Sequence, residues 1–162
     1  MFVKESYAGT KEQNYGVLLR QLEHLIRDEP NRIANLANAA ALLHQFLEDV
    51  NWVGFYLLED GELVLGPFQG LPACIRIPLG KGVCGTSALK GEPVVVDDVH
   101  AFPGHIACDA ASNSEIVVPL RDRSGRLVGV LDIDSPRFSR FDDIDLRYLV
   151  RFNETLGAGL GD

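Results

Sequence analysis

The stretch from His100 to Glu115 concentrates side chains that can do chemistry. Its sequence is HAFPGHIACDAASNSE, and its reactive side chains are His100, His105, Cys108, Asp109 and Glu115. Pro103 and Gly104 interrupt regular secondary structure, whereas the following EIVVPL is typical of a strand. A thiol among imidazoles and carboxylates at a loop-to-strand boundary is a setting in which thiolate reactivity can be tuned. We therefore interpret this loop as one wall of an active site.

A second candidate group lies in the segment LVGVLDID. Strand alternation places Asp132 and Asp134 on one face of the strand and Leu131 and Ile133 on the other. Aspartate is disfavoured in strands, and a buried carboxylate needs a partner or a raised pKa. We therefore interpret the two aspartates as functional residues rather than as part of a solvated face.

The three cysteines, Cys74, Cys84 and Cys108, suggest three kinds of chemistry. A Cys-His peptidase needs an oriented histidine and an oxyanion hole, and neither His100 nor His105 has an evident orienting partner. A zinc site drawn from the cysteines and His105 would have long and irregular spacings, so no metal is expected. Redox chemistry fits best: one cysteine becomes a sulfenic acid, a second resolves it as a disulfide, and nearby acids protonate an oxygen leaving group. The alternative to all three is burial as small hydrophobic side chains.

Two further features have a structural and a binding interpretation. Trp52, the only tryptophan, is either core filler, which the sequence alone favours, or an aromatic wall for a small ligand. The glycines of LGKGVCG lack the Gly-Lys-Ser/Thr order of a phosphate-binding loop. A helix N-terminus behind these glycines can still hold an anion such as a ligand carboxylate.

Helices are expected at both ends of the chain. Thr10 and Gln13 have the spacing of a capping box, which predicts a helix beginning near Thr10. A second helix is predicted after it, with Pro30 in its first turn. Residues 83–90 can form a short helix, and a final helix is predicted with Ser139 and Asp142 as its caps.

The middle of the chain predicts strands. VNWVGFYLL and ELVLGPF form a hairpin signal around residues 59–61, and EIVVPLRDRSGRLVGVLDIDS forms a second one turning at residues 123–125. CIRIP and PVVVDDV add two more strands. Because hairpins dominate, we expect an α+β fold, with a mainly antiparallel central sheet, helices packed on its faces and a pocket between one sheet face and the loops.

Composition excludes several classes of protein. The chain has 162 residues, 46% of them hydrophobic, which suits one compact domain. Its net charge of −8 argues against a general nucleic-acid binder. No apolar run approaches the ~18 residues of a membrane span, and the first residues lack the apolar core of a signal peptide. An odd number of cysteines is unusual for a secreted disulfide framework, so a reducing, cytoplasmic setting is expected.

Three segments resemble one known family. RIPLGKGVCGTSA, DVHAFPGHIACDAASNSEIVVPL and GVLDIDSPRFSRFD are similar to the free methionine-(R)-sulfoxide reductases, which are GAF-domain enzymes. The similarity covers nearly the whole chain, and the HIACDxxSxSEIVVP segment is far more specific than the GAF fold in general. The residues that stand where the family pattern has them are Trp52, Cys74, Cys84, Cys108, Glu115, Asp132 and Asp134.

The resemblance implies a GAF-like single domain over residues 1–162 that reduces free L-methionine-(R)-sulfoxide, but not the same residue within proteins. It implies no cofactor, because thioredoxin supplies the reducing equivalents, and it allows a homodimer. Cys108 would attack the sulfoxide sulfur as a thiolate. Either Cys74 or Cys84 would then close a disulfide with it; Cys74 is preferred, but the sequence does not rank the two.

The resemblance also implies roles for the remaining residues. Glu115, Asp132 and Asp134 would polarise and protonate the sulfoxide oxygen and bind the ammonium group. Trp52 would pack on the S-methyl end, and backbone N–H groups of the loops would bind the carboxylate.

A different class of function is the alternative. Most GAF domains are sensor modules that bind a small molecule and are linked to an output domain. The sequence shows no output domain, and a sensor would have no obvious use for the cysteines and the acids. A sensor would keep its ligand after all three cysteines were changed to serine, whereas a thiol enzyme would lose its activity.

Overall fold

The computed structural model describes residues 1–106 and 108–161. Ala107, in the predicted active-site loop, and Asp162, the last residue of the predicted domain, lie outside the described residues. The elements in chain order are α1 (Lys11–Ile26), α2 (Arg32–Phe46), β1 (Trp52–Glu59), β2 (Glu62–Gln69), β3 (Arg76–Pro78), α3 (Gly82–Lys90), β4 (Val94–Val96), the 3-10 turn η1 (Val99–Ala101), β5 (Ser114–Arg121), β6 (Leu127–Ser135) and α4 (Asp143–Ala158).

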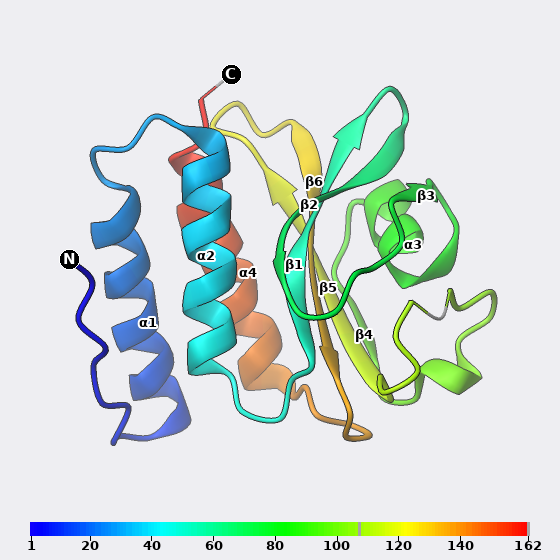
Figure 1. Cartoon of the computed structure of the whole chain (residues 1–162), viewed down its shortest axis with the longest axis horizontal. Helices are drawn as coiled ribbons and strands as arrows, with labels where there is room; N and C mark the ends of the chain where they lie inside the picture. Colours follow the sequence, from blue (N-terminus) through cyan, green and yellow to red (C-terminus); the bar gives the residue numbers. More distant parts are fainter. Residues whose placement is uncertain (107, 162) are drawn as a thin grey trace.

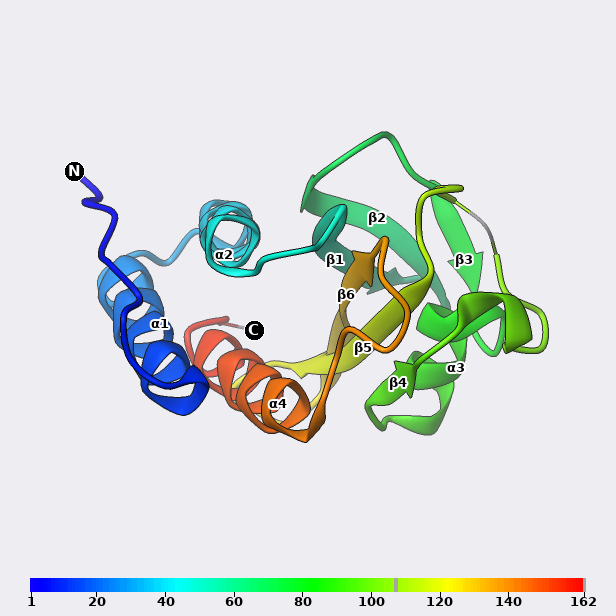
Figure 2. The same ribbon diagram turned by 90° about the horizontal axis from the view of Figure 1, so that it is seen from below.

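The six strands form one sheet in the order β3-β2-β1-β6-β5-β4, and every neighbouring pair is antiparallel. This confirms the prediction of an α+β fold around an antiparallel sheet. In Figure 1 the helices α2 and α4 lie beside the sheet, with α1 outside them, and α3 lies on the other side. Figure 2 shows the same layers from below, with α3 and the edge strands β3 and β4 on the side away from α1, α2 and α4.

Helix ends follow local hydrogen bonding. The Thr10 capping box at the start of α1 is confirmed, and Asp142 caps α4 as predicted. Ser139, also predicted as a cap, has a left-handed φ of 51° and lies outside the helix, so that part of the prediction was wrong. The placement of Pro30 in the first turn of α2 was also wrong. Asn31 is the N-cap and accepts a hydrogen bond from the backbone N–H of Ala34, which satisfies a donor that a helix start otherwise leaves free.

Both predicted hairpins are present. Asp60 and Gly61 join β1 to β2 with positive φ values of 49° and 82°, the pattern of a turn that matches the strand twist. The turn between β5 and β6 is organised by Asp122, whose carboxylate accepts hydrogen bonds from the backbone N–H groups of Ser124 at 2.9 Å and Arg126 at 3.1 Å. These turns set the register that aligns side chains across the sheet.

The sheet separates two apolar cores. Between the sheet and the helices α1, α2 and α4 lies the larger core, which contains Leu131 and Ile133. The opposite face of the sheet packs on α3 and the loops and carries Trp52, Tyr56 and Val130. In the described part of the chain, no helix is both long and apolar enough to cross a membrane.

Candidate active site

Strand register aligns three of the predicted site residues in one row across the sheet. Trp52 on β1 is the partner of Asp134 on β6, and Asp134 is in turn the partner of Glu115 on β5. Asp132 lies two residues from Asp134 on β6 and pairs with Gly54 on β1. Because alternate residues of a strand share a face, the two aspartates lie on the same side as Trp52. The prediction that they do not face solvent is confirmed: both line a pocket, and Asp132 is buried.

The indole of Trp52 combines the two roles that its sequence position suggested. It is 2% exposed and stacks with Phe68, with ring centroids 5.2 Å apart, and with Tyr56, at 5.8 Å. Its Nε1 donates to the backbone oxygen of Leu71 at 3.1 Å, which fixes its orientation. A side chain at Gly54 would come within 2.8 Å of the indole and 2.3 Å of the Phe68 Cβ, so this glycine leaves the space that the stack occupies. Trp52 is therefore both core filler and a wall of the pocket.

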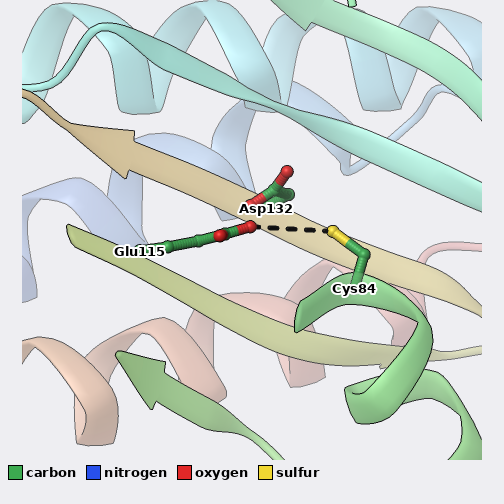
Figure 3. Close-up of side chains that lie close together, drawn as sticks. All are labelled: Cys84, Glu115 and Asp132. Atoms are coloured by element: carbon green, nitrogen blue, oxygen red, sulfur yellow. Dashed lines mark hydrogen bonds between the residues drawn. The ribbon is translucent and has the colours of Figure 1, made fainter. Parts of the chain in front are cut away.

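Cys84 lies at the base of the pocket beside two of the acids. It belongs to the first turn of α3, and its Sγ lies 3.9 Å from Glu115 Oε1, as Figure 3 shows. Cys84, Glu115 and Asp132 are 4%, 6% and 6% exposed. One potential ligand atom from each of the three lies within 4.8 Å of the others. All three were predicted as site residues, but their mutual contact could not be predicted because they come from three separate elements.

The loop before β5 forms one wall of the pocket, as expected. His105, Cys108, Asp109 and Ser112 line it, and His105 Nε2 lies 3.9 Å from Glu115 Oε2. His100 does not line it; its ring nitrogen instead lies 3.0 Å from Asn113 Oδ1, in an exposed position.

A disulfide joins two of the three cysteines. Cys74, from the connection between β2 and β3, bonds to Cys108 in the loop, across 34 residues of sequence and a Cα–Cα distance of 5.7 Å. Cys84 is free and buried. The sequence left open which cysteine pairs with Cys108, and this geometry selects Cys74. The zinc site considered from the sequence used all three cysteines and His105. These residues are not available as four free ligands, because two of the cysteines are joined in the disulfide.

The pocket is nearly closed in this disulfide form. Its cavity volume is about 30 Å³, room for only one or two water molecules. The lining also includes Leu71, Pro72 and Ala73 beside the disulfide, and Lys81, Gly82 and Val83 at the start of α3. That helix begins with no side-chain cap at Lys81, so no capping side chain occupies the N–H groups of its first turn, which is compatible with the anion-binding interpretation.

The three acids are protonated more readily than ordinary carboxyls. Burial raises the pKa of Glu115 well above its usual value, and the charges of Asp132 and Asp134 raise it further. The pKa of Asp134 is raised mainly by burial and then by Asp132 and Asp109. Burial also raises the pKa of Asp132, against the lowering effect of hydrogen bonds with Glu115 and Cys84. Among the described residues no lysine or arginine forms an ion pair with any of the three acids.

The two remaining titratable neighbours shift in the directions that burial dictates. Burial raises the pKa of the Cys84 thiol well above its usual value, and the charges of Asp132 and Glu115 add to this effect. Burial lowers the pKa of His105, and His100 lowers it further. Burial therefore favours the uncharged form of each of these groups, the acids and the thiol by a raised pKa and the imidazole by a lowered one.

Replacing Glu115 with glutamine is expected to make the protein more stable at alkaline pH. Below the unfolded-state pKa of about 4.3 both states hold the proton, so the carboxyl costs nothing. As pH rises towards the higher folded-state pKa, the unfolded state releases its proton first, and the free energy of unfolding falls by about 1.4 kcal/mol for each unit of pKa difference. The Glu115→Gln protein should lack this decline.

Urea unfolding at a series of pH values from 4 to 8, with the disulfide intact, measures the effect. Glu92→Gln, which changes an exposed glutamate in the same way, is the control and should follow the unmodified protein. Equal pH slopes for the Glu115→Gln protein and the unmodified protein would show that Glu115 is not desolvated as described.

Tyr56 is a pocket residue that the sequence reasoning missed. Its hydroxyl donates to the backbone oxygen of Cys74 at 2.8 Å, so it ties the disulfide segment to the sheet. Burial and the charge of Asp132 raise its pKa. The available signal was alternation along β1: Trp52, Gly54 and Tyr56 lie on one face, and the first of them had already been considered as a pocket wall.

Comparisons with known proteins agree with this geometry. Residues 35–160 match the model of the GAF domain family. The chain is 60% identical over 162 residues to Protein YtsP of Bacillus subtilis, covering 99% of each chain. It is 55% identical over 143 residues to the free methionine-R-sulfoxide reductase of Escherichia coli, covering 86% of each. The solved structure of free methionine-R-sulfoxide reductase from Neisseria meningitidis, in complex with its substrate, superposes with a TM-score of 0.92 at 47% identity, covering 98% of this chain and 95% of that one.

The antiparallel sheet, with helices on one face and a loop-walled pocket on the other, is that of a GAF-domain protein. The extent and identity of the matches carry the assignment further. The chain belongs to the family of the free methionine-R-sulfoxide reductases.

Proposed function

We propose that this protein reduces free methionine-(R)-sulfoxide to methionine by thiol chemistry. The observation that supports this most strongly is the Cys74–Cys108 disulfide in the wall of a pocket that also contains three carboxyl groups of raised pKa. Thiols supply the two electrons that reduction of a sulfoxide needs, and neutral acids supply the protons.

The cycle begins with both Cys74 and Cys108 reduced. The Cys108 thiolate attacks the sulfoxide sulfur, the S–O bond breaks, and the protonated oxygen passes to Cys108, which leaves methionine and a cysteine sulfenic acid. The Cys74 thiol then attacks the sulfenic sulfur, forms the disulfide and releases water. Across the cycle one sulfoxide and two thiols become one sulfide, one disulfide and one water. No resident cofactor or metal takes part, because the cysteines carry both electrons.

The acids provide the proton and bind the amino end of the substrate. A carboxyl with a raised pKa keeps its proton to higher pH than an ordinary carboxyl and can donate it to the sulfoxide oxygen as the S–O bond weakens. Glu115 and Asp134 have the strongest upward shifts of the three, so these two are the candidate donors. A substrate ammonium supplies the positive charge that this group of acids lacks within the protein, and Asp132 contributes to its binding.

The other end of the pocket suits the rest of the amino acid. The N-terminus of α3 at Gly82 offers free backbone N–H groups to the substrate carboxylate. Trp52 presents an aromatic face to the S-methyl end. Because both the ammonium and the carboxylate are bound within one pocket, a methionine sulfoxide whose ends are joined in a peptide does not fit.

The disulfide must open before the substrate enters. The cavity of about 30 Å³ in the disulfide form has no room for an amino acid, so reduction comes first and the substrate second. Trp52, as the only tryptophan, reports this directly through its fluorescence. We expect free methionine-(R)-sulfoxide to change the fluorescence of reduced Cys108→Ser protein, which binds without turnover, and to leave that of the disulfide form unchanged. An equal response from the two forms would contradict this order of events.

Thioredoxin is the proposed reductant of the disulfide, and the cytoplasm is the proposed compartment. Cys74 and Cys108 are each partly exposed, and the neighbours of Cys74 include the exposed apolar side chains of Leu71 and Ile75. Such a setting suits a dithiol protein that must approach the disulfide closely. All the site residues come from one chain, so the proposed chemistry needs no second copy, and a homodimer stays a prediction.

Oxidation of NADPH coupled through thioredoxin reductase and thioredoxin tests the function. We expect turnover with free L-methionine-(R)-sulfoxide, and none above background with the S form or with N-acetyl-methionine-(R)-sulfoxide amide, in which both ends are blocked. Comparable rates with the blocked compound would contradict enclosure of the free amino acid. Turnover of neither free form, with dithiothreitol as an alternative reductant, would contradict the function itself.

A further inference from the structure

We propose that Cys84, Glu115 and Asp132 form a Zn²⁺ site, with His105 as fourth ligand, and that Zn²⁺ bound there blocks the substrate pocket. We call these three residues the acid–thiol cluster. The cycle above uses Cys74 and Cys108 and assigns no step to Cys84, although its thiol lies at the base of the pocket. The site is inhibitory and takes no part in the reaction.

The geometry of the acid–thiol cluster is close to that of a metal site. One potential ligand atom from each of its three residues lies within 4.8 Å of the others, and Cys84 Sγ lies 3.9 Å from Glu115 Oε1. Ligand atoms around a tetrahedral zinc lie roughly 3.3–3.7 Å apart, given bond lengths of about 2.0–2.3 Å. The most widely separated of these atoms therefore need to draw together by up to about 1.5 Å. Figure 3 shows them converging from α3, β5 and β6.

Asp132 gives an independent sign of a missing ligand. Asp132 is 6% exposed and lines the pocket. Its buried Oδ1 has no hydrogen-bond partner among the described residues. An unpaired carboxylate oxygen in such a position is costly unless a cation or a proton donor reaches it. No lysine or arginine pairs with it in the described part of the chain.

The types of donor select zinc over the hard cations. Mg²⁺ and Ca²⁺ take six or more oxygen ligands, and neither uses a thiolate. A sulfur, two carboxylates and an imidazole form a four-coordinate set suited to Zn²⁺. His105 would have to move in to supply the imidazole: it lines the same pocket, and its Nε2 lies 3.9 Å from Glu115 Oε2. The ion displaces the protons of the thiol and the two carboxyls to solvent, and the resulting thiolate and carboxylates compensate its charge.

Binding of the metal excludes the substrate because the two share side chains. Glu115 and Asp132 are also the proposed contacts for the sulfoxide oxygen and the ammonium group, so a pocket that holds Zn²⁺ cannot hold methionine sulfoxide. The block of turnover rests on the proposed function. Metal binding itself does not, and it is measured separately.

The disulfide form of the full chain allows a direct test with the metal alone. The protein has three cysteines, so closing Cys74–Cys108 leaves Cys84 as the only thiol. We expect one equivalent of Zn²⁺ to bind in competition with a chromophoric chelator. We also expect Co²⁺ to give a thiolate-to-metal charge-transfer band in the near ultraviolet, which Zn²⁺ removes.

The Cys84→Ala and Asp132→Asn proteins should each bind Zn²⁺ at least about 100-fold more weakly, since loss of even an outer-shell partner costs 10–100-fold. Cys84→Ala should also lose the cobalt band.

A matched pair of histidine variants separates the site from adventitious binding. His105→Gln should weaken Zn²⁺ binding, whereas His44→Gln, which removes an exposed imidazole on α2, should not. A missing cobalt band, or affinity that depends on His44 and not on Cys84 and Asp132, would overturn the proposal. If the Cys84→Ala protein does not fold, the Asp132→Asn and His105→Gln comparisons still decide.

The block of turnover is measured on reduced enzyme as methionine formed in a single turnover. Zn²⁺ should raise the substrate concentration needed for half-maximal conversion, and excess chelator should reverse the effect. The inhibition by Zn²⁺ is also measured for the Asp132→Asn protein, as a fraction of that variant's own rate without metal. If this fraction equals that of the unmodified protein, the inhibitory metal lies at Cys108, and the proposed block at the acid–thiol cluster is overturned. If the protein reduced no sulfoxide and still bound Zn²⁺ as expected, the proposed function would be contradicted and the proposed metal site would be supported.

Discussion

Replacing Cys108 with serine is expected to lower the turnover of free methionine-(R)-sulfoxide by at least about 10³-fold. A serine hydroxyl remains protonated at neutral pH and cannot accept the oxygen as a sulfenic acid does, so the route through the enzyme is lost rather than slowed. The measurement is methionine formed with dithiothreitol as reductant, which removes any dependence on recognition by thioredoxin.

Cys74→Ser is the matched variant, because it removes the other half of the same disulfide. Reduced beforehand and freed of external reductant, it should form about one methionine per chain at a normal rate and then stall with Cys108 as the sulfenic acid, which a dimedone reagent traps. A Cys108→Ser protein with more than a tenth of the normal rate would contradict the assignment of the nucleophile. The assignment would also be contradicted if the Cys74→Ser protein lost its first turnover and the Cys108→Ser protein kept it.

Removing one acid of the pocket is expected to give the second-largest loss. Glu115→Gln and Asp134→Asn should each lower turnover by about 10²-fold or more, the usual scale for loss of a general acid. Both substitutions keep the shape of the side chain, so the loss reports the proton and the charge. Glu92→Gln and Asp143→Asn, which make the same changes at exposed positions, are the controls. Losses below tenfold in both pocket variants would contradict the acid assignment.

The pH dependence of turnover has a definite sign. A general acid works while it is protonated, and burial raises the pKa of Glu115 and of Asp134. Activity should therefore persist to higher pH than an ordinary carboxyl would allow and fall as pH rises through the raised pKa. Glu115 and Asp134 interact, so the fall belongs to the pair rather than to either residue. The variant that lacks the true donor should lose this alkaline limb.

Local patterns predicted most of the secondary structure. The hairpin at residues 59–61 and the capping box at Thr10 could be read from a few neighbouring letters, because their hydrogen bonds are local. The errors were local as well. Pro30 and Ser139 are compatible with helix starts, but Asn31, next to Pro30, and Asp142, three residues after Ser139, are the caps. Only the folded chain shows which residue accepts the N–H groups.

The candidate site was predictable in membership but not in arrangement. Alternation in LVGVLDID already placed Asp132 and Asp134 together. Their alignment with Glu115 depends on the register between β5 and β6, which local patterns do not fix. The pairing of Cys74 with Cys108, and the place of Cys84 beside the acids, depend on how the loop and α3 fold back over the sheet. Contacts between elements this far apart in sequence leave no periodic signal in a single chain.

The most direct test of the account is a single turnover without external reductant. Fully reduced protein is mixed with excess free L-methionine-(R)-sulfoxide, and the products are methionine, measured by chromatography, and disulfides, located by peptide mapping. We predict one methionine per chain, a Cys74–Cys108 disulfide and a Cys84 that remains a free thiol. A disulfide that contains Cys84 would contradict the assigned resolving residue. The absence of methionine, in a protein that still binds the sulfoxide, would contradict the reductase and point to a GAF sensor instead.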